Sequence, residues 1–274
     1  MVIHWSASPE ILTLGPLTLR WYGLLFAAGF LLGFKMIENI FKREGRTTEH
    51  LDALLLYLII GTTVGARLGH CLFYEPEVYL KNPIRMLYIW EGGLASHGGT
   101  LGDIIALFLF CRRYGYDLRY IIDRISMPVA LTSCFIRIGN LMNSEILGKP
   151  TGGDWGVVFT RIDQIPRHPS MLYESLSYLL TFLLMRWLYY KTDWAWFMGK
   201  MWGLFFICIW GTRFFIEFFK ENQVGFEQGM TLNMGQLLSI PFVLLGFWLI
   251  YDSRNHPIEH RVASSDKPKK KRKK

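Results

Sequence analysis

Long apolar stretches recur along the chain, and they constrain its fold more than any other feature. A helix that crosses the hydrocarbon core of a bilayer needs about 20 apolar residues, and seven stretches approach that length. They lie at about 18–36, 51–73, 93–111, 119–140, 170–190, 197–219 and 235–251. Hydrophobic residues make up 51% of the 274 residues and charged residues only 19%, which excludes an intrinsically disordered chain. The sequence predicts an all-α integral membrane protein with seven transmembrane helices.

The distribution of lysine and arginine predicts the orientation of these helices. The connections on one side hold 19 Lys or Arg residues and those on the other hold 7. Because cytoplasmic loops are the richer in these residues, we expect the N-terminus outside the cytoplasm and the C-terminus inside. Residues 266–274 carry six of the eight net positive charges. The overall charge therefore indicates membrane topology, and no nucleic-acid partner is predicted.

Three segments lie outside the predicted membrane domain or interrupt it. Residues 1–17 are predicted to form an interfacial N-terminal arm, and 252–274 a basic cytoplasmic tail. Within the membrane domain at 18–251, residues 141–169 are too few for a core of their own and are predicted to form a small extracytoplasmic cap. The histidines and cysteines show no metal-ligand spacing, so the sequence predicts neither a metal nor a cofactor.

Polar and ionisable residues of the predicted spans gather at the depth of the outer membrane surface. Such residues are costly in a bilayer and mark candidate functional sites. The predicted orientation brings the following to that depth: Tyr22, Arg67, His70, His97, Arg137, Asn140, His168, Tyr173, Glu174, Arg213 and Glu217. A transporter of an anionic solute, the alternative, would need polar residues that continue inward, and only Asp103, Asp123 and Arg124 lie deeper. A third alternative is a lipid-binding scaffold without catalysis.

Three arginines at one depth predict an anion-binding site made of Arg67, Arg137 and Arg213. A guanidinium group binds phosphate through two parallel hydrogen bonds and stays protonated. Arg213 and Glu217 are four residues apart and share a helix face, so they are also expected to pair. One such pair alone is more often structural than functional, whereas three arginines at one depth favour a binding site.

The third predicted span begins with Ser96, His97, Gly98 and Gly99. The two glycines would let a phosphate or a substrate backbone approach closely. Histidine has a pKa that suits proton transfer near pH 7. The alternative is an interfacial histidine at a helix start, followed by glycines that serve helix packing.

Short motifs follow one another in order along nearly the whole chain. They are Trp21 to Gly23, Gly65 to Gly69, Trp90 to Gly99, Arg137 to Gly148, Trp155 to Phe159, Arg167 to Glu174, Arg213 to Phe219 and Met234 to Pro241. In these motifs the chain resembles the bacterial phosphatidylglycerol–prolipoprotein diacylglyceryl transferase family. The most specific are R-I-G-N-L-M-N-S-E-I-L-G and R-H-P-S-M-L-Y-E. The chain departs from the family at Ile209, where a tyrosine is common, and at Lys149, where an arginine is common.

The resemblance implies a reaction in the bacterial plasma (inner) membrane. The sn-1,2-diacylglyceryl group of phosphatidylglycerol would pass to the lipobox cysteine thiol of a prolipoprotein, and glycerol phosphate would leave. The implied partners are phosphatidylglycerol, the prolipoprotein signal peptide with its lipobox cysteine, and the membrane. On this interpretation His97 is the base, while Arg137 and Arg213 stabilise the leaving group. The remaining candidates would bind substrate or hold the arginines: Tyr22, Arg67, Gly98, Gly99, Asn140, Asn143, Glu145, Gly148, His168 and Glu217.

Overall fold

The structure, a computed structural model, describes residues 1–15, 17–89, 92–221 and 229–258. Trp90 and most of the predicted basic tail lie outside the described residues. The described chain is mainly helical, with α1 (Trp21–Arg43), α2 (Leu51–Phe73), α3 (Pro76–Lys81), α4 (Ser96–Tyr114), α5 (Leu118–Asn143), α6 (Ser170–Lys191), α7 (Lys200–Ile216) and α8 (Met234–Asp252). Four 3₁₀ turns are also described: η1 (Pro83–Leu87), η3 (Trp194–Trp196), η4 (Glu217–Phe219) and η6 (Ser253–Asn255).

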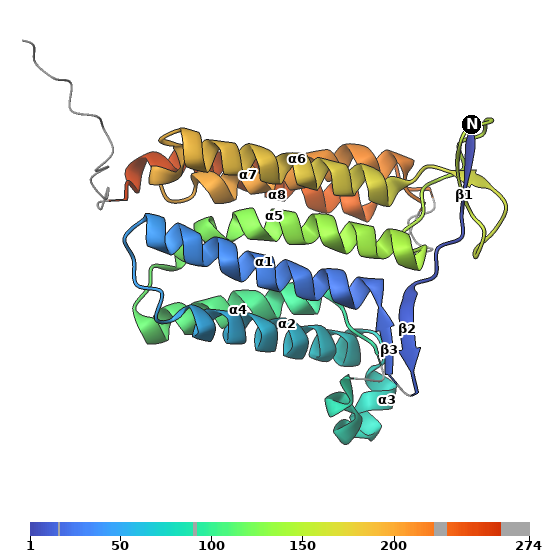
Figure 1. Ribbon diagram of the computed structural model, residues 1–274, viewed down its shortest axis with the longest axis horizontal. Helices are drawn as coiled ribbons and strands as arrows, with labels where there is room; N and C mark the ends of the chain where they lie inside the picture. The colour runs from blue at the N-terminus through green and yellow to red at the C-terminus, as the bar shows by residue number, and fades with distance from the viewer. Residues whose placement is uncertain (16, 90–91, 222–228, 259–274) are drawn as a thin grey trace, which may run out of the picture. The chain divides into compact units, whose positions relative to one another are not determined.

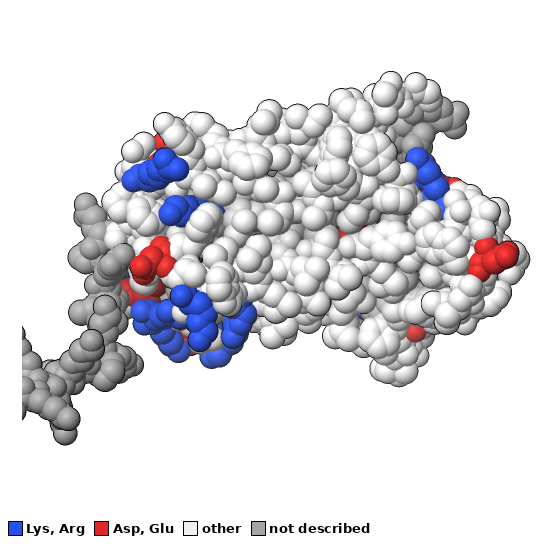
Figure 2. Space-filling model, turned by 90° about the horizontal axis from the view of Figure 1, so that it is seen from above, with Lys and Arg blue, Asp and Glu red and all other residues white. Residues whose placement is uncertain are grey.

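Five of the described helices are long and apolar enough to cross a membrane. They are α1, α2, α5, the segment Lys200–Phe219 that contains α7, and the segment Met234–Asn255 that contains α8. The helices α4 and α6 are more polar, since α4 begins with Ser96, His97 and two glycines and α6 carries several serines and tyrosines. The face shown in Figure 2 is uncharged over its broad middle, and its lysines and arginines gather mainly at one end. The fold is that of an integral membrane protein.

The chain divides into two compact units. The first contains Met1–Gly45 and the described residues from Asp123 onward, and the second is Arg46–Ile122. In the first unit α1, α6, α7, α8 and the larger part of α5 run alongside one another (Figure 1). The second unit contains α2, α3 and α4, and α5 begins in it.

A buried charged cluster ties together one end of the first unit. Arg124 Nε lies 2.8 Å from Glu44 Oε1, and Arg124 Nη1 lies 2.9 Å from Asp123 Oδ2. Asp123 Oδ1 also accepts hydrogen bonds from the backbone N–H groups of Gly199 and Trp202, at 2.9 and 3.0 Å. Glu44 directly follows α1, while Gly199 and Trp202 lie at the start of α7. Their contacts with Asp123 and Arg124 of α5 therefore join the three helices.

In the second unit α2 and α4 pack backbone against backbone, as they run side by side in Figure 1. Glycines of α2 face glycines of α4: a Cβ atom at Gly98 would collide with the carbonyl oxygen of Gly65, and one at Gly102 with that of Gly61. Small residues that let two backbones approach are typical of helix contacts in membranes. This packing accounts for the glycine at position 98 without a ligand.

Short strands occupy the two segments that the sequence predicts to be an arm and a cap. Strand β1 (Val2–Trp5) pairs in parallel with β4 (Gly156–Phe159), which pairs antiparallel with β5 (Pro166–Arg167). Strands β2 (Glu10–Leu14) and β3 (Leu17–Arg20) form a separate antiparallel pair. The Trp5 indole N–H donates to the Leu141 carbonyl at 3.1 Å. The first five residues are therefore part of a small sheet, which the sequence did not predict.

Candidate active site

A group of buried charged side chains lies in the first unit where α5 ends and α6 begins. The Nε atom of Arg137, near the end of α5, lies 2.9 Å from Oε2 of Glu174, which is in the second turn of α6. The Glu174 side chain is fully buried, and 14% of the Arg137 side chain remains exposed. Arg137 Nη1 also donates to Asn140 Oδ1 at 3.2 Å. The carboxylate and the amide thus orient the guanidinium group of a side chain that is not fully buried.

Lys220 completes this group of charges. Its Nζ atom lies 3.3 Å from Glu174 Oε1 and 2.9 Å from Glu217 Oε2, and only 3% of its side chain is exposed. Lys220 could not be recognised from the sequence because it directly follows a predicted span, where a lysine is normally solvated. Glu217 was expected to pair with Arg213. It pairs with Lys220 instead, because η4 tightens the chain after α7 and brings residues three apart together.

Arg213 lies close to the same group of charges. Its guanidinium carbon is 5.2 Å from the centre of the Trp210 ring, and its Nε atom is buried with no hydrogen-bond partner among the described residues. Tyr178 of α6 has Arg213, Arg137 and Glu174 as electrostatic neighbours, and the Arg137 guanidinium carbon is 6.0 Å from the centre of its ring. Tyr178 packs against Ile209. Tyr178 therefore brings a hydroxyl group to this group of charges from α6, while position 209, where a tyrosine is common in the family, holds Ile209.

The segment after Arg137 folds back on the end of α5. The side-chain amides of Asn140 and Asn143 each donate to the Glu145 carboxylate at 3.1 Å. Glu145 thus holds two asparagines, whereas it was expected to hold an arginine. Ser144 and Ile146 have positive φ angles of 55° and 58°, a backbone conformation that is uncommon outside glycine and often marks a functional turn.

Tyr22, in the first turn of α1, packs on α5. A Cβ atom at Gly139 would lie 2.7 Å from Tyr22 Cδ2 and 3.3 Å from its Cα atom. The glycine between Arg137 and Asn140 therefore allows α1 to approach this turn of α5. Glu145 and Arg137 are electrostatic neighbours of the Tyr22 hydroxyl, so the structure brings Tyr22 together with the arginine site.

His168 lies at the start of α6, among aromatic side chains. Its ring centre is 5.0 Å from those of Trp155 and Phe219, and its Nδ1 atom lies 3.3 Å from the Tyr173 hydroxyl. Its backbone N–H donates to the Lys149 carbonyl at 3.0 Å. His168 thus lies two residues before α6, where its backbone and its ring both contact the chain around the helix start.

Gly148 and Arg167 connect the predicted cap to this part of the chain. Gly148 forms a bridge with Lys220, and a Cβ atom at Gly148 would collide with the His168 carbonyl oxygen. Arg167 donates to the Gly148 carbonyl at 3.3 Å and to Asp163 at 2.6 Å. The hydrogen bond from Arg167 holds the pKa of the Asp163 carboxyl below its usual range. Gly148 thus serves close backbone packing beside Lys220.

The candidate base His97 belongs to the second unit. It lies in the first turn of α4 with an exposed side chain. Its ring centre is 5.7 Å from that of Tyr74, which in turn stacks on His70 at 5.7 Å. Gly99 is buried beside Ala66 and Thr62. The imidazole of His97 is thus accessible while the two glycines that follow it face α2.

Arg67 differs from the other two arginines because backbone carbonyl groups surround it. Nε donates to Met86 at 3.1 Å, Nη2 to Arg85 at 2.7 Å, and Nη1 to Gly92 and, at 3.4 Å, to Gly93. The residue is only 2% exposed. Arg67 therefore organises the connection between α3 and α4. The three arginines that the sequence places at one depth therefore do not share one environment.

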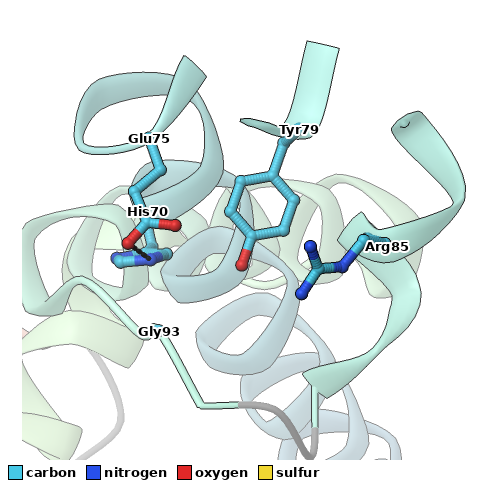
Figure 3. A pocket seen from close by; sticks show the side chains of 5 residues that line it. All are labelled: His70, Glu75, Tyr79, Arg85 and Gly93. Carbon is cyan, nitrogen blue, oxygen red and sulfur yellow. Dashed lines mark ion pairs between the residues drawn. The ribbon is translucent and has the colours of Figure 1, made fainter. Parts of the chain in front are cut away.

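An open hollow of about 470 Å³ in the second unit is lined by His70, Glu75, Tyr79, Arg85 and Gly93 (Figure 3). His70 Nε2 lies 3.8 Å from Glu75 Oε1, and the Arg67 guanidinium carbon is 4.9 Å from the centre of the Tyr79 ring. Glu75 on one side and Arg85 on the other give the lining both a carboxylate and a guanidinium group, so neither sign of charge dominates this hollow.

Apolar helices with buried arginine–carboxylate pairs at one end of the first unit define an integral membrane protein with a charged site. The chain belongs to the prolipoprotein diacylglyceryl transferase family, whose model matches residues 9–251. The chain is 51% identical to the phosphatidylglycerol–prolipoprotein diacylglyceryl transferase of Tolumonas auensis over 91% of this chain and 96% of that protein. It is 44% identical to the protein of that name from Chloroherpeton thalassium, over 92% and 94%. For the Porphyromonas gingivalis protein the identity is 43%, over 95% and 98%.

Proposed function

We propose that the protein transfers the sn-1,2-diacylglyceryl group of phosphatidylglycerol to the lipobox cysteine thiol of a prolipoprotein. The cysteine sulfur attacks the glyceryl carbon that bears the phosphate ester. A C–S bond forms, the C–O bond to the phosphate breaks, and glycerol phosphate leaves with the bonding electron pair. The product is a thioether. This is the first step of bacterial lipoprotein maturation, and the family and the relatives support it.

The observation that carries the proposal within the site is the pair Arg137 and Arg213. Negative charge builds on the phosphate as the C–O bond breaks, and preoriented cations at that position are among the largest contributions to catalysis. Arg137 is oriented by Glu174 and Asn140 and remains partly exposed. Arg213 has a buried Nε without a partner among the described residues. Together they stabilise the phosphate as it leaves.

The thiol must lose its proton before it attacks, since the thiolate is the nucleophile. In the proposal His97 takes this proton, and its exposed imidazole at the start of α4 supports the assignment. Tyr22, Asn140 and Asn143 bind or orient the lipid head group through neutral hydrogen bonds. The protein needs no cysteine of its own, because the substrate supplies the nucleophile.

We further propose seven membrane spans, formed by α1, α2, α4, α5, α6, α7 and α8. The N-terminus lies outside the cytoplasm and the C-terminus inside, in the bacterial inner membrane. The strands at 2–20 and 156–167 then form an extracytoplasmic cap with the N-terminal arm. The excess of lysine and arginine in alternate connections supports this orientation. The exposed leucines of α6, among them Leu176 and Leu180, support a lipid-facing position for that helix.

The test uses the purified full chain, phosphatidylglycerol vesicles and a peptide that contains a lipobox cysteine. Mass spectrometry measures the lipidated peptide, and an enzymatic assay measures the glycerol phosphate released. We expect both products in equal amounts. A matched peptide with serine in place of cysteine serves as control and should give neither. A lipid-binding scaffold or an anion transporter would release no glycerol phosphate, so that result would contradict the proposal.

A further inference from the structure

Lys220 is held firmly in place at the meeting point of three segments. Its backbone forms a bridge with Gly148, and its neighbours Phe219 and Glu221 bond to Lys149 and Leu147 at 2.8 and 3.1 Å. Its ammonium group contacts Glu174 of α6 and Glu217 of η4. A lysine is almost never buried unless it is paired. The position of Lys220 is therefore a specific feature of the site and not that of a loop lysine.

Lys220 supplies one of the two cations that pair directly with the buried carboxylates of this group. Glu174 and Glu217 contribute two negative charges, and Arg137 and Lys220 contribute two positive ones. Arg213 adds a further positive charge nearby, and its Nε atom has no hydrogen-bond partner among the described residues. Without Lys220, two buried carboxylates would compete for Arg137 and Arg213. Buried charges that lose their partner reorganise the groups around them.

Glu174 transmits the position of Lys220 to Arg137. Lys220 contacts Oε1 of Glu174, and Arg137 contacts Oε2 of the same carboxylate. The carboxylate is planar and fully buried, so a cation on one oxygen fixes the direction in which the other points. The Arg137 contact is an ion pair rather than an aligned hydrogen bond, since Glu174 Oε2 has no hydrogen-bond partner among the described residues. Its direction therefore depends on how Glu174 is held.

We propose that Lys220 is a positioning residue for Arg137: by binding Glu174 and Glu217 it keeps both carboxylates off the substrate-facing part of the arginine pair. This role rests on the proposed function above. Lys220 does not touch the substrate, and its effect passes through Glu174. A misplacement of about 1 Å in a catalytic group can reduce a rate about 100-fold, so the loss of this lysine should be visible in kcat.

The experiment compares four variants of the full chain in the transfer assay, with thermal unfolding measured in the same detergent. Lys220→Met removes the charge at similar length, and we expect kcat to fall about 100-fold with a smaller change in KM for phosphatidylglycerol. Lys220→Arg keeps the charge and should retain most of the activity. The double variant Lys220→Met with Glu217→Gln also removes a carboxylate that the single variant leaves without its lysine partner, and it should recover part of the lost kcat. Lys149→Met is the matched control, because Lys149 is an exposed lysine nearby, and it should resemble wild type.

Recovery by the second substitution separates positioning from a merely structural role. If Lys220→Met is as active as wild type, the proposal is overturned. It is also overturned if the double variant folds but remains as inactive as the single one. If Lys220→Met alone fails to fold, the activity of the double variant is compared with that of Lys220→Arg instead. A folded double variant without transfer activity then overturns the proposal. A wild-type chain that transfers nothing would instead overturn the proposed function itself, so the two failures can be told apart.

Discussion

Arg67 and Arg213 are both arginines in membrane helices, but the hydrogen-bond partners of their guanidinium groups differ. In the second unit Arg67 directs its guanidinium group at four backbone carbonyls between positions 85 and 93. In the first unit Arg213 has a buried Nε with no hydrogen-bond partner among the described residues. The bonds of Arg67 to four carbonyls hold a loop, whereas the Nε donor of Arg213, which is free within the described part of the chain, supports its proposed role in binding an anion.

Two helix contacts, one in each unit, also differ in how they are held together. In the second unit α2 and α4 meet through glycines, and the contact is backbone against backbone. In the first unit α5, α6 and η4 meet through the buried ion pairs of Arg137, Glu174, Glu217 and Lys220. The first arrangement depends on shape and the second on charge. Substitutions should therefore affect the two units in different measurable ways.

The largest effect is expected for His97→Gln, which removes the proposed base. General base catalysis contributes about 10²–10⁴-fold to a rate, so transfer should fall by that factor. The variant should fold normally because the side chain is exposed. His4→Gln, at another exposed histidine in β1, is the control. Turnover near that of wild type would contradict the assignment of His97 as the base.

Arg137→Gln should lower kcat by about 10²–10³-fold, as does the loss of one preoriented donor in other active sites. Unfolding should also begin at a lower temperature, because Glu174 loses an ion-pair partner. Arg20→Gln changes an exposed arginine in β3 and serves as control. A variant that transfers at the wild-type rate would show that the ion pair with Glu174 is structural only.

Gly102→Ala should reduce the stability of the second unit by about 1–3 kcal/mol, the usual cost of overpacking. The added methyl group would collide with the Gly61 carbonyl. Gly211→Ala in α7 is the matched control, since a Cβ atom there meets nothing within 4 Å. Thermal unfolding in detergent measures both. Equal stability of the two variants would contradict the packing described for α2 and α4.

The smallest effect is expected for deletion of residues 266–274. Six of the eight net positive charges lie there, and the proposed role of this tail is contact with the anionic cytoplasmic membrane surface. Transfer by the purified enzyme should remain close to that of the full chain. A folded but inactive truncation would assign the tail a part in catalysis.

The helices could be predicted well from the sequence, because a bilayer demands long apolar runs. The stretch predicted at 51–73 coincides with α2, and that at 170–190 ends one residue before α6 does. Helix α1 extends past the predicted end to Arg43. Its last turns carry Glu38, which pairs with Lys35 and Lys42, so the helix continues although the apolar run stops.

The partners within the site could not be predicted in the same way. Arg137 and Glu174 are far apart in the sequence, and Lys220 looks like an ordinary loop lysine. The parallel pairing of β1 with β4 joins segments more than 150 residues apart, for which a four-residue strand gives no signal. Arg67 was grouped with the other arginines because depth can be deduced from the sequence, while the direction of a guanidinium group cannot.

A side-by-side measurement of Arg67→Gln and Arg213→Gln tests the difference between the two arginines most directly. Each purified variant is assayed for transfer per folded molecule and for thermal unfolding. We expect Arg213→Gln to fold like wild type and to lose about 10²–10³-fold in kcat. We expect Arg67→Gln to unfold more easily, by about 1–3 kcal/mol for carbonyls left without donors, while its folded fraction still transfers. The reverse pattern, an unstable but active Arg213 variant beside a stable but inactive Arg67 variant, would contradict this account.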